Sequence, residues 1–145
     1  MKRNRALFWI CLVIAVFSAL LLITGSPWLV KPLGGQTAPP LGNVTTALGC
    51  IALSLMPWFL LRWWGKKTTK WYWSLQFTTV LAFGFSIFWW PVGRMLSGNW
   101  SNLFLQRPIA SKWFWNYSYG LVSLSFMLLL LICITRILNG KNEKP

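Results

Sequence analysis

Residues 6–24 read ALFWICLVIAVFSALLLIT, an uninterrupted apolar run without a charged side chain. Within it, only Ser18 and the terminal Thr24 carry a hydroxyl group. A helix of about 20 residues, rising about 1.5 Å per residue, crosses the roughly 30 Å hydrocarbon core of a bilayer. The run therefore predicts a membrane-spanning helix over residues 6–24.

Three further apolar segments follow, and turn-forming residues separate them. Gly and Pro residues lie at 25–27 and 39–42, Gly65 precedes two lysines, and Pro91 is expected to stop the third segment. The sequence predicts one all-α domain over residues 1–145. It is a bundle of four transmembrane helices at about 6–24, 44–63, 72–91 and 117–137, with a short polar cytoplasmic tail at 139–145.

The basic residues predict the orientation of these helices. Cytoplasmic segments of membrane proteins carry an excess of Lys and Arg. If both termini are cytoplasmic, ten cations lie inside and four lie outside, at Lys31, Arg94, Arg107 and Lys112. We therefore expect a multi-pass protein of the bacterial inner membrane with both termini in the cytoplasm. The tryptophans near the helix ends are expected to form belts at the headgroup level.

The composition argues against most kinds of catalysis. The 145 residues include 14 Lys and Arg, one carboxylate (Glu143) and no histidine, for a net charge of +13. General acid–base catalysis, proton coupling and metal binding rely mostly on Asp, Glu and His. We therefore expect no enzyme activity, no catalytic residues, no metal site and no cofactor.

The high positive charge does not by itself indicate nucleic-acid binding. The cations lie at the ends of apolar segments rather than on one face or arm, so we expect no nucleic-acid partner. The three cysteines, Cys11, Cys50 and Cys133, lie inside apolar segments and form no C-x-x-C pair. They are expected to pack as small apolar residues.

The second outer loop, at about 92–116, combines basic and aromatic residues. Leu96, Trp100, Leu103 and Phe104 follow helical spacing, which predicts a short interfacial helix. The surface either anchors the loop to membrane lipids or recognises a partner protein or an anionic ligand. The residues expected to form it are Arg94, Trp100, Phe104, Arg107, Lys112, Trp113 and Trp115.

Small side chains recur at every fourth position in the second and third apolar segments. Small residues let membrane helices approach closely, and hydroxyl groups add weak hydrogen bonds. Because the predicted inner turn is short, we expect the two helices to form an antiparallel hairpin with these stripes facing each other. The stripes are Gly42, Thr46, Cys50 and Ser54 on one helix, and Ser74, Thr78, Ala82 and Ser86 on the other.

These features leave binding as the expected mode of action. The first hypothesis is a non-catalytic accessory or assembly subunit of a larger membrane complex. Its partners would be membrane lipids and one or more membrane proteins, or further copies of itself. One alternative is an immunity-type protein that protects against a membrane-acting toxin. Another is a protein that binds or transports lipids or small anions through the second outer loop.

Overall fold

The computed structural model describes residues 2–34, 40–64, 70–97 and 108–141. Within these ranges the chain is helical, with an isolated antiparallel bridge between Pro32 and Pro40. The elements are α1 (Lys2–Ile23), the 3-10 helix η1 (Pro27–Val30), α2 (Leu41–Trp64), α3 (Lys70–Ile87), α4 (Trp89–Ser97) and α6 (Pro108–Lys141). The predicted all-α class is confirmed.

Among the described residues, three helices are long and apolar enough to cross a membrane. These are α1, α2 and, within α6, the segment Lys112–Leu138. Their outward surfaces are rich in exposed apolar side chains, such as Phe17 and Ile23 on α1 and Leu130 and Ile137 on α6. Contiguous apolar surface of this kind is unfavourable in water and favourable in lipid. The chain has the architecture of a multi-pass membrane protein.

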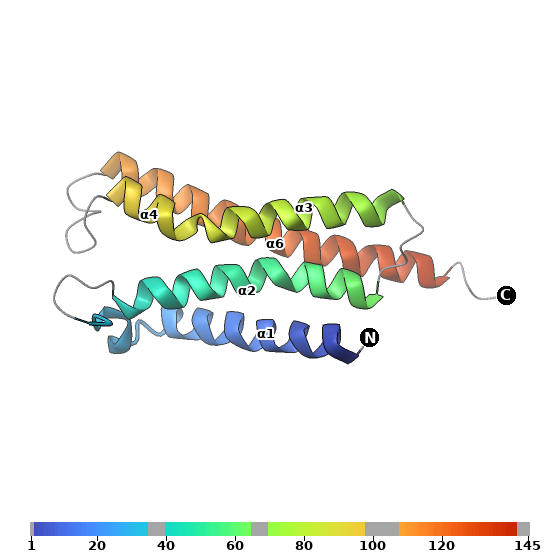
Figure 1. The fold of residues 1–145 in the computed structure, drawn as a ribbon, viewed down its shortest axis with the longest axis horizontal. Helices are drawn as coiled ribbons and strands as arrows, with labels where there is room; N and C mark the ends of the chain where they lie inside the picture. The colour runs from blue at the N-terminus through green and yellow to red at the C-terminus, as the bar shows by residue number, and fades with distance from the viewer. Residues whose placement is uncertain (1, 35–39, 65–69, 98–107, 142–145) are drawn as a thin grey trace.

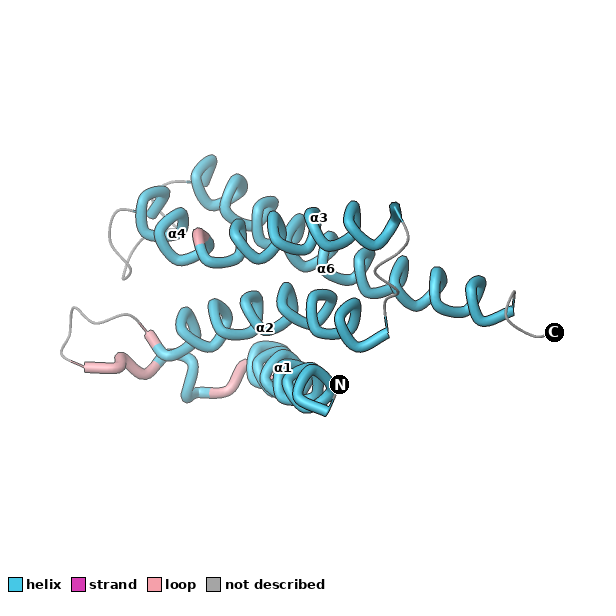
Figure 2. The backbone as a smooth tube through the Cα atoms, turned by 45° about the vertical axis from the view of Figure 1, so that its right-hand side comes forward, coloured by secondary structure: helices cyan, strands magenta, loops and turns pink. Residues whose placement is uncertain are grey.

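The helices form an elongated bundle with two distinct ends (Figure 1). The N-terminus, the end of α2, the start of α3 and the end of α6 lie at one end, which we call the termini end. The other end, which we call the loop end, contains η1, the start of α2, α4 and the start of α6. The view in Figure 2 shows α2 between α1 and the pair formed by α3 and α6. Helix α2 packs against all three and is the central helix.

Pro91 does not end the third helical segment, contrary to the sequence prediction. Helix α3 ends at Ile87, and α4 begins two residues later and runs through Pro91 to Ser97. Pro91 is the third residue of α4, where a backbone N–H has no partner inside the helix. The Phe88 N–H donates to the Gly84 carbonyl (3.4 Å), and the Val92 N–H donates to the Phe88 carbonyl (2.9 Å). The proline therefore interrupts the helix at Phe88, and the chain continues in a helical course.

Other helix boundaries extend beyond the predicted spans. Helix α6 was expected over 117–137 and runs from Pro108 to Lys141, so the start of the expected polar tail belongs to the helix. Hydropathy marks the part of a helix inside lipid, and backbone hydrogen bonds continue the helix past that limit. Pro108 suits the first helical position, because its φ angle is fixed near the helical value. The predicted interfacial helix falls mainly on residues 98–107, outside the described residues.

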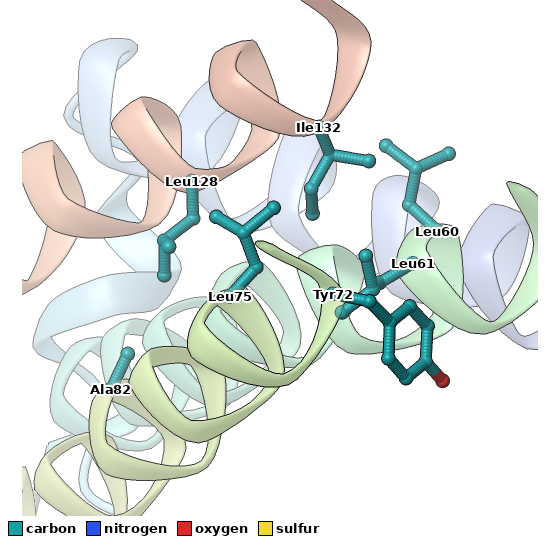
Figure 3. Close-up of a cluster of buried hydrophobic side chains, with 7 residues drawn as sticks. All are labelled: Leu60, Leu61, Tyr72, Leu75, Ala82, Leu128 and Ile132. Atoms are coloured by element: carbon teal, nitrogen blue, oxygen red, sulfur yellow. The ribbon is translucent and has the colours of Figure 1, made fainter. Parts of the chain in front are cut away.

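The core of the bundle consists of three clusters along its length. One joins α2, α3 and α6 towards the termini end, and Figure 3 shows its side chains converging from the three helices. A second joins α2, α4 and α6 at the loop end. A third lies between α1 and α2. The buried members are Leu60, Leu61, Tyr72, Leu75, Ala82, Leu128 and Ile132 in the first, Ala47, Cys50, Trp89, Phe114 and Leu121 in the second, and Cys11, Ala52 and Met56 in the third.

Helices α1 and α2 are in close contact where Ser18 meets Gly49. A Cβ atom added at Gly49 would lie 2.8 Å from the Ser18 Cβ and 3.1 Å from its Oγ. Real Cβ atoms do not come so close to another carbon atom, so the contact requires glycine. Cys11 and Ser18 are the buried residues of α1, and Ala15 packs beside them. Small residues therefore let α1 approach the central helix closely at this point.

Candidate interaction surfaces

The two predicted small-residue stripes meet in their second halves. The hydroxyl oxygens of Ser54 and Ser86 are 2.8 Å apart and buried, and they join α2 to α3. The Ser54 hydroxyl also lies within hydrogen-bond distance of the Ile51 carbonyl (2.9 Å). Ala82, one turn before Ser86, is fully buried with an exposed fraction of 0%. Close packing and a hydroxyl pair thus hold α2 and α3 together at this point.

The first half of the α3 stripe lies away from the interface. Ser74 is exposed, and the half-buried Thr78 uses its hydroxyl to donate to the Ser74 carbonyl (3.0 Å). A residue every fourth position drifts by about 40° per step around a helix of 3.6 residues per turn. The buried face of α3 instead alternates steps of three and four, which keeps it on one side of the helix. Its members are Tyr72, Leu75, Thr79, Ala82 and Ser86.

The α2 stripe faces several neighbours in turn. A Cβ atom at Gly42 would lie 2.9 Å from the Leu29 carbonyl oxygen, so the absence of a side chain at Gly42 allows η1 to pack against α2. Thr46 is half-buried and donates to the Gly42 carbonyl (2.7 Å). Cys50 belongs to the cluster with α4 and α6, and Ser54 meets α3. The same angular drift explains why one stripe on the central helix serves different partners.

Ala82 and Thr78 give a matched test of this offset. We expect Ala82→Leu to lower the free energy of unfolding by about 1–3 kcal/mol, because the added carbons enter a fully packed contact. Thr78→Leu is expected to change it by no more than about 0.5 kcal/mol, since this position is partly open. Unfolding of both variants in mixed detergent micelles, followed by circular dichroism, measures the difference. Equal losses for the two variants would contradict the observed face.

The predicted aromatic and basic surface is described in part. Trp100, Phe104 and Arg107 lie outside the described residues, and for Arg94, in α4, only the backbone is described. Lys112, Trp113 and Trp115 lie in the first turns of α6 and are exposed. The exposed fractions of the two tryptophans are 67% and 46%. The described part of this surface is therefore a helix face, where the sequence predicted a loop.

The opposite face of these turns is fixed to α4 and α3. The indole N–H of Trp89 donates to the Ser118 hydroxyl (2.9 Å), and that hydroxyl donates to the Phe114 carbonyl (2.9 Å). The Trp89 and Phe114 rings pack with their centroids 5.0 Å apart. A Cβ atom at Gly93 would lie 3.0 Å from the Phe114 ring, so this glycine of α4 makes room for it. The Tyr117 hydroxyl donates to the Phe85 carbonyl of α3.

These contacts correct the expected role of Trp89. Its place at a helix end predicted a membrane-surface position, yet the side chain is buried inside the bundle. The indole N–H finds a hydroxyl partner there, which removes the cost of burying an unpaired donor. The sequence shows the tryptophan and Ser118, but their 29-residue separation conceals the hydrogen bond.

The outward face of the same turns exposes several apolar and aromatic side chains. The rings of Trp115 and Tyr119 stack with centroids 6.0 Å apart and planes at 29°. We call the exposed residues Ile109, Lys112, Trp113, Trp115 and Tyr119 the aromatic platform. Sequence reasoning missed Ile109 and Tyr119, although the spacing of four between Trp115 and Tyr119 gives a signal for the second. The platform lies at the loop end of the bundle.

The chemical repertoire of the described residues is narrow. Within the ranges that the structure describes, no group of three or more His, Cys, Asp or Glu side chains could hold a metal ion. Cys11, Cys50 and Cys133 lie on three different helices as free thiols. Glu143, the single carboxylate of the sequence, lies outside the described residues. The described groups can pack, stack and donate or accept hydrogen bonds.

Comparison with known proteins found no similar family model, curated protein or solved structure.

Proposed function

We propose that the chain is a non-catalytic accessory or assembly subunit of a membrane complex and binds a membrane-protein partner through the aromatic platform. The observation that carries this proposal is the contrast between the two faces at the start of α6. One face is held by Trp89, Ser118 and Gly93, while the other exposes aromatic rings and a lysine. A surface fixed from behind loses little conformational entropy on binding. Tryptophan and tyrosine are enriched at protein interfaces.

The proposed orientation places both termini in the cytoplasm of a bacterial cell, with α3 and α4 together forming the third of four crossings. Helices α3 and α4 follow one another along α6, and the two termini lie at the same end of the bundle (Figure 1). An even number of crossings returns the chain to its starting side. The orientation fits the cytoplasmic excess of basic residues, because α1 begins and α2 and α6 end on that side with exposed cations. These are Lys2, Arg3, Arg5, Arg62 and Arg136.

Cysteine labelling tests this orientation. In a variant without the native cysteines, Lys31→Cys should react with a membrane-impermeant maleimide in intact spheroplasts. Arg136→Cys should react only after the membrane is permeabilised. Labelling of Arg136→Cys in intact spheroplasts would contradict a cytoplasmic termini end.

Site-specific crosslinking tests the docking proposal. A photoreactive amino acid at Trp113 or Tyr119 should yield one crosslinked species in native membranes. The same group at Phe126, an exposed residue further along α6, serves as the lipid-facing control. A crosslink to a single membrane protein from the platform positions alone supports the proposal. Crosslinks only to lipid from all three positions would assign the platform to anchoring.

A matched pair of variants then tests whether the platform is required. Trp113→Ser with Trp115→Ser should release the partner from a complex purified in mild detergent, by at least about tenfold. Trp28→Ser is the control, because Trp28 is also an exposed tryptophan at the loop end, with an exposed fraction of 62%. Loss of the partner with both variants, or with neither, would contradict a specific role for the platform.

A further inference from the structure

The termini end of the bundle carries a group of exposed cations that the docking proposal does not use. Helix α1 begins there, and α2 and α6 end there (Figure 1). No Asp or Glu occurs in the part of the chain that the structure describes, so no described carboxylate neutralises these charges. The group consists of Lys2, Arg3, Arg5, Arg62 and Arg136.

Two of these arginines are held against tryptophan rings. The Arg5 guanidinium of α1 lies 5.5 Å from the ring centroid of Trp63, which belongs to α2. The Arg62 guanidinium lies 4.7 Å from the ring centroid of Trp58, one turn earlier on the same helix. Trp63 is itself packed against Phe8 and Trp64, with centroids 6.2 and 5.3 Å apart. The Arg5 contact therefore joins the ends of two helices.

This arrangement leaves the hydrogen-bonding edges of the guanidinium groups available. A guanidinium group carries five N–H donors, and a cation–π contact brings its charge near the ring without using a hydrogen-bond acceptor. Neither Arg5 nor Arg62 hydrogen-bonds to another residue of the described ranges. A planar donor fork of this kind matches two oxygens of a phosphate group.

The position of the two arginine–tryptophan pairs favours a lipid headgroup as the source of a phosphate ligand. Both lie at the ends of membrane-length apolar helices, where tryptophan favours the headgroup level of a bilayer. Next to Arg5 along α1, Trp9, Ile10 and Val13 are exposed and offer an apolar surface for an acyl chain. A headgroup phosphate and a hydrocarbon tail on one molecule satisfy both features. Basic groups between membrane helices bind anionic lipid headgroups by this combination.

We propose that the termini end binds an anionic phospholipid, whose phosphate is held by Arg5 and Arg62 beside Trp63 and Trp58 and whose acyl chain lies along the exposed face of α1. The lipid supplies the negative charge that the described part of the chain lacks. This binding site lies at the opposite end from the aromatic platform. It does not depend on the identity, or the existence, of a protein partner there.

Native mass spectrometry of the purified full-length protein tests the proposal. The protein is titrated in detergent with phosphatidylglycerol and, separately, with phosphatidylcholine of the same acyl chains. The anionic lipid should bind about tenfold more tightly. Arg5→Gln and Arg62→Gln should each weaken its binding about fivefold and leave the zwitterionic lipid unaffected. Circular dichroism and elution volume confirm that each variant is folded.

Two matched variants separate a shaped site from general attraction between charges. Arg5→Lys keeps the charge but loses the planar fork, so it should also weaken binding of phosphatidylglycerol by at least about threefold. Lys31→Gln removes a cation that lies 5.1 Å from the Trp28 ring at the loop end, and it should leave binding unchanged. Equal losses from Lys31→Gln and Arg5→Gln would overturn the proposal, as would unchanged binding in the Arg5→Gln, Arg62→Gln double variant.

A competition experiment distinguishes a lipid phosphate from other anions. Glycerophosphoglycerol, the deacylated form of phosphatidylglycerol with the same phosphodiester charge and no acyl chain, should not displace phosphatidylglycerol at equal concentration. Displacement at that concentration would assign the site to a soluble phosphate and overturn the lipid proposal. A stoichiometric acidic protein that dissociates from the Arg5→Gln, Arg62→Gln variant would also overturn it, because the arginines would then belong to a protein interface.

Discussion

Gly49→Leu should separate α1 from the central helix and lower the free energy of unfolding by about 2–3 kcal/mol. Even a single added carbon would lie 2.8 Å from the Ser18 Cβ, and a leucine adds three more. The Ser18 Cβ is bonded directly to the backbone, so it cannot move aside without moving α1. Because α1 packs mainly on α2, this helix has few other contacts that could hold it in place.

The measurement is unfolding in mixed micelles, followed by circular dichroism. Gly120→Leu is the matched control, because nothing lies within 4 Å of a Cβ atom at Gly120, an exposed glycine of α6. It should leave the free energy of unfolding within about 0.5 kcal/mol of the unmodified protein. If the two leucine variants lose the same free energy of unfolding, the loss comes from replacing glycine in general. The contact between Gly49 and Ser18 would then not explain it.

A compensating substitution makes the test of the helix contact more specific. Gly49→Ala alone should destabilise the protein, because its Cβ meets the Ser18 Cβ. Combining it with Ser18→Gly adds a Cβ atom on α2 and removes the facing Cβ atom from α1. Only one Cβ atom then lies between the two helices. The double variant should regain most of the stability lost by Gly49→Ala. Purely additive losses would show that the two positions do not touch.

The sequence was sufficient to predict the helical class and the approximate location of the apolar helices. Runs such as residues 6–24 leave few alternatives, because each backbone polar group must be paired within a helix when lipid surrounds it. The end of the third segment was predicted wrongly. Pro91 is compatible with two opposite predictions, because proline disrupts the interior of a helix but is tolerated in its first turn. The local sequence does not say which of these applies.

Packing partners were harder to predict than helices. Small residues at every fourth position predicted the region where Ser54 and Ser86 meet, but that spacing drifts around the helix and misplaced Ser74 and Thr78. The close contact of Ser18 with Gly49 was not predicted, although Cys11, Ala15 and Ser18 place small residues at steps of four and three along α1. Which faces meet depends on the relative rotation of whole helices, and no short motif encodes that rotation.

The aromatic residues illustrate the same limit. The sequence predicted Trp89 at a helix end and Trp113 in the second outer loop, both near the membrane surface, yet one is buried and the other has an exposed fraction of 67%. The difference comes from Ser118 and Gly93, which provide a hydrogen-bond partner for Trp89 and space for the neighbouring Phe114 ring. The composition of this region indicated a candidate surface, and the fold decides which of its tryptophans are exposed to a partner.

Trp89→Leu should lower the free energy of unfolding by about 2–4 kcal/mol, the second large effect expected in this protein. The substitution removes a buried ring that packs on Phe114, and it removes the donor to Ser118. Trp73→Leu is the matched control, because Trp73 lies on α3 with an exposed fraction of 60%. It should change the stability by less than about 1 kcal/mol. Circular dichroism is the suitable probe, since both variants alter tryptophan fluorescence.

A third variant shows how much of the loss a smaller aromatic ring recovers. Trp89→Phe keeps an aromatic ring but loses the indole N–H and the volume of the smaller indole ring, so its cost should be about 1–2 kcal/mol, less than that of Trp89→Leu. Ser118 still has the Phe114 carbonyl as its acceptor, which limits the penalty. A loss for Trp89→Phe as large as that for Trp89→Leu would show that an aromatic ring packed on Phe114 does not by itself hold α4 to α6.

The Trp89→Leu variant also tests whether the core supports the proposed docking surface. If Trp89 fixes the start of α6, then Trp89→Leu should increase hydrogen exchange in residues 108–119 while exchange near Leu128 and Ile132, in the cluster towards the termini end, stays slow. Partner binding through the aromatic platform should weaken in parallel, although no platform residue has changed. Unchanged exchange in residues 108–119 would mean that the platform is held by contacts other than Trp89, and the argument that α4 preorganises the surface would fail.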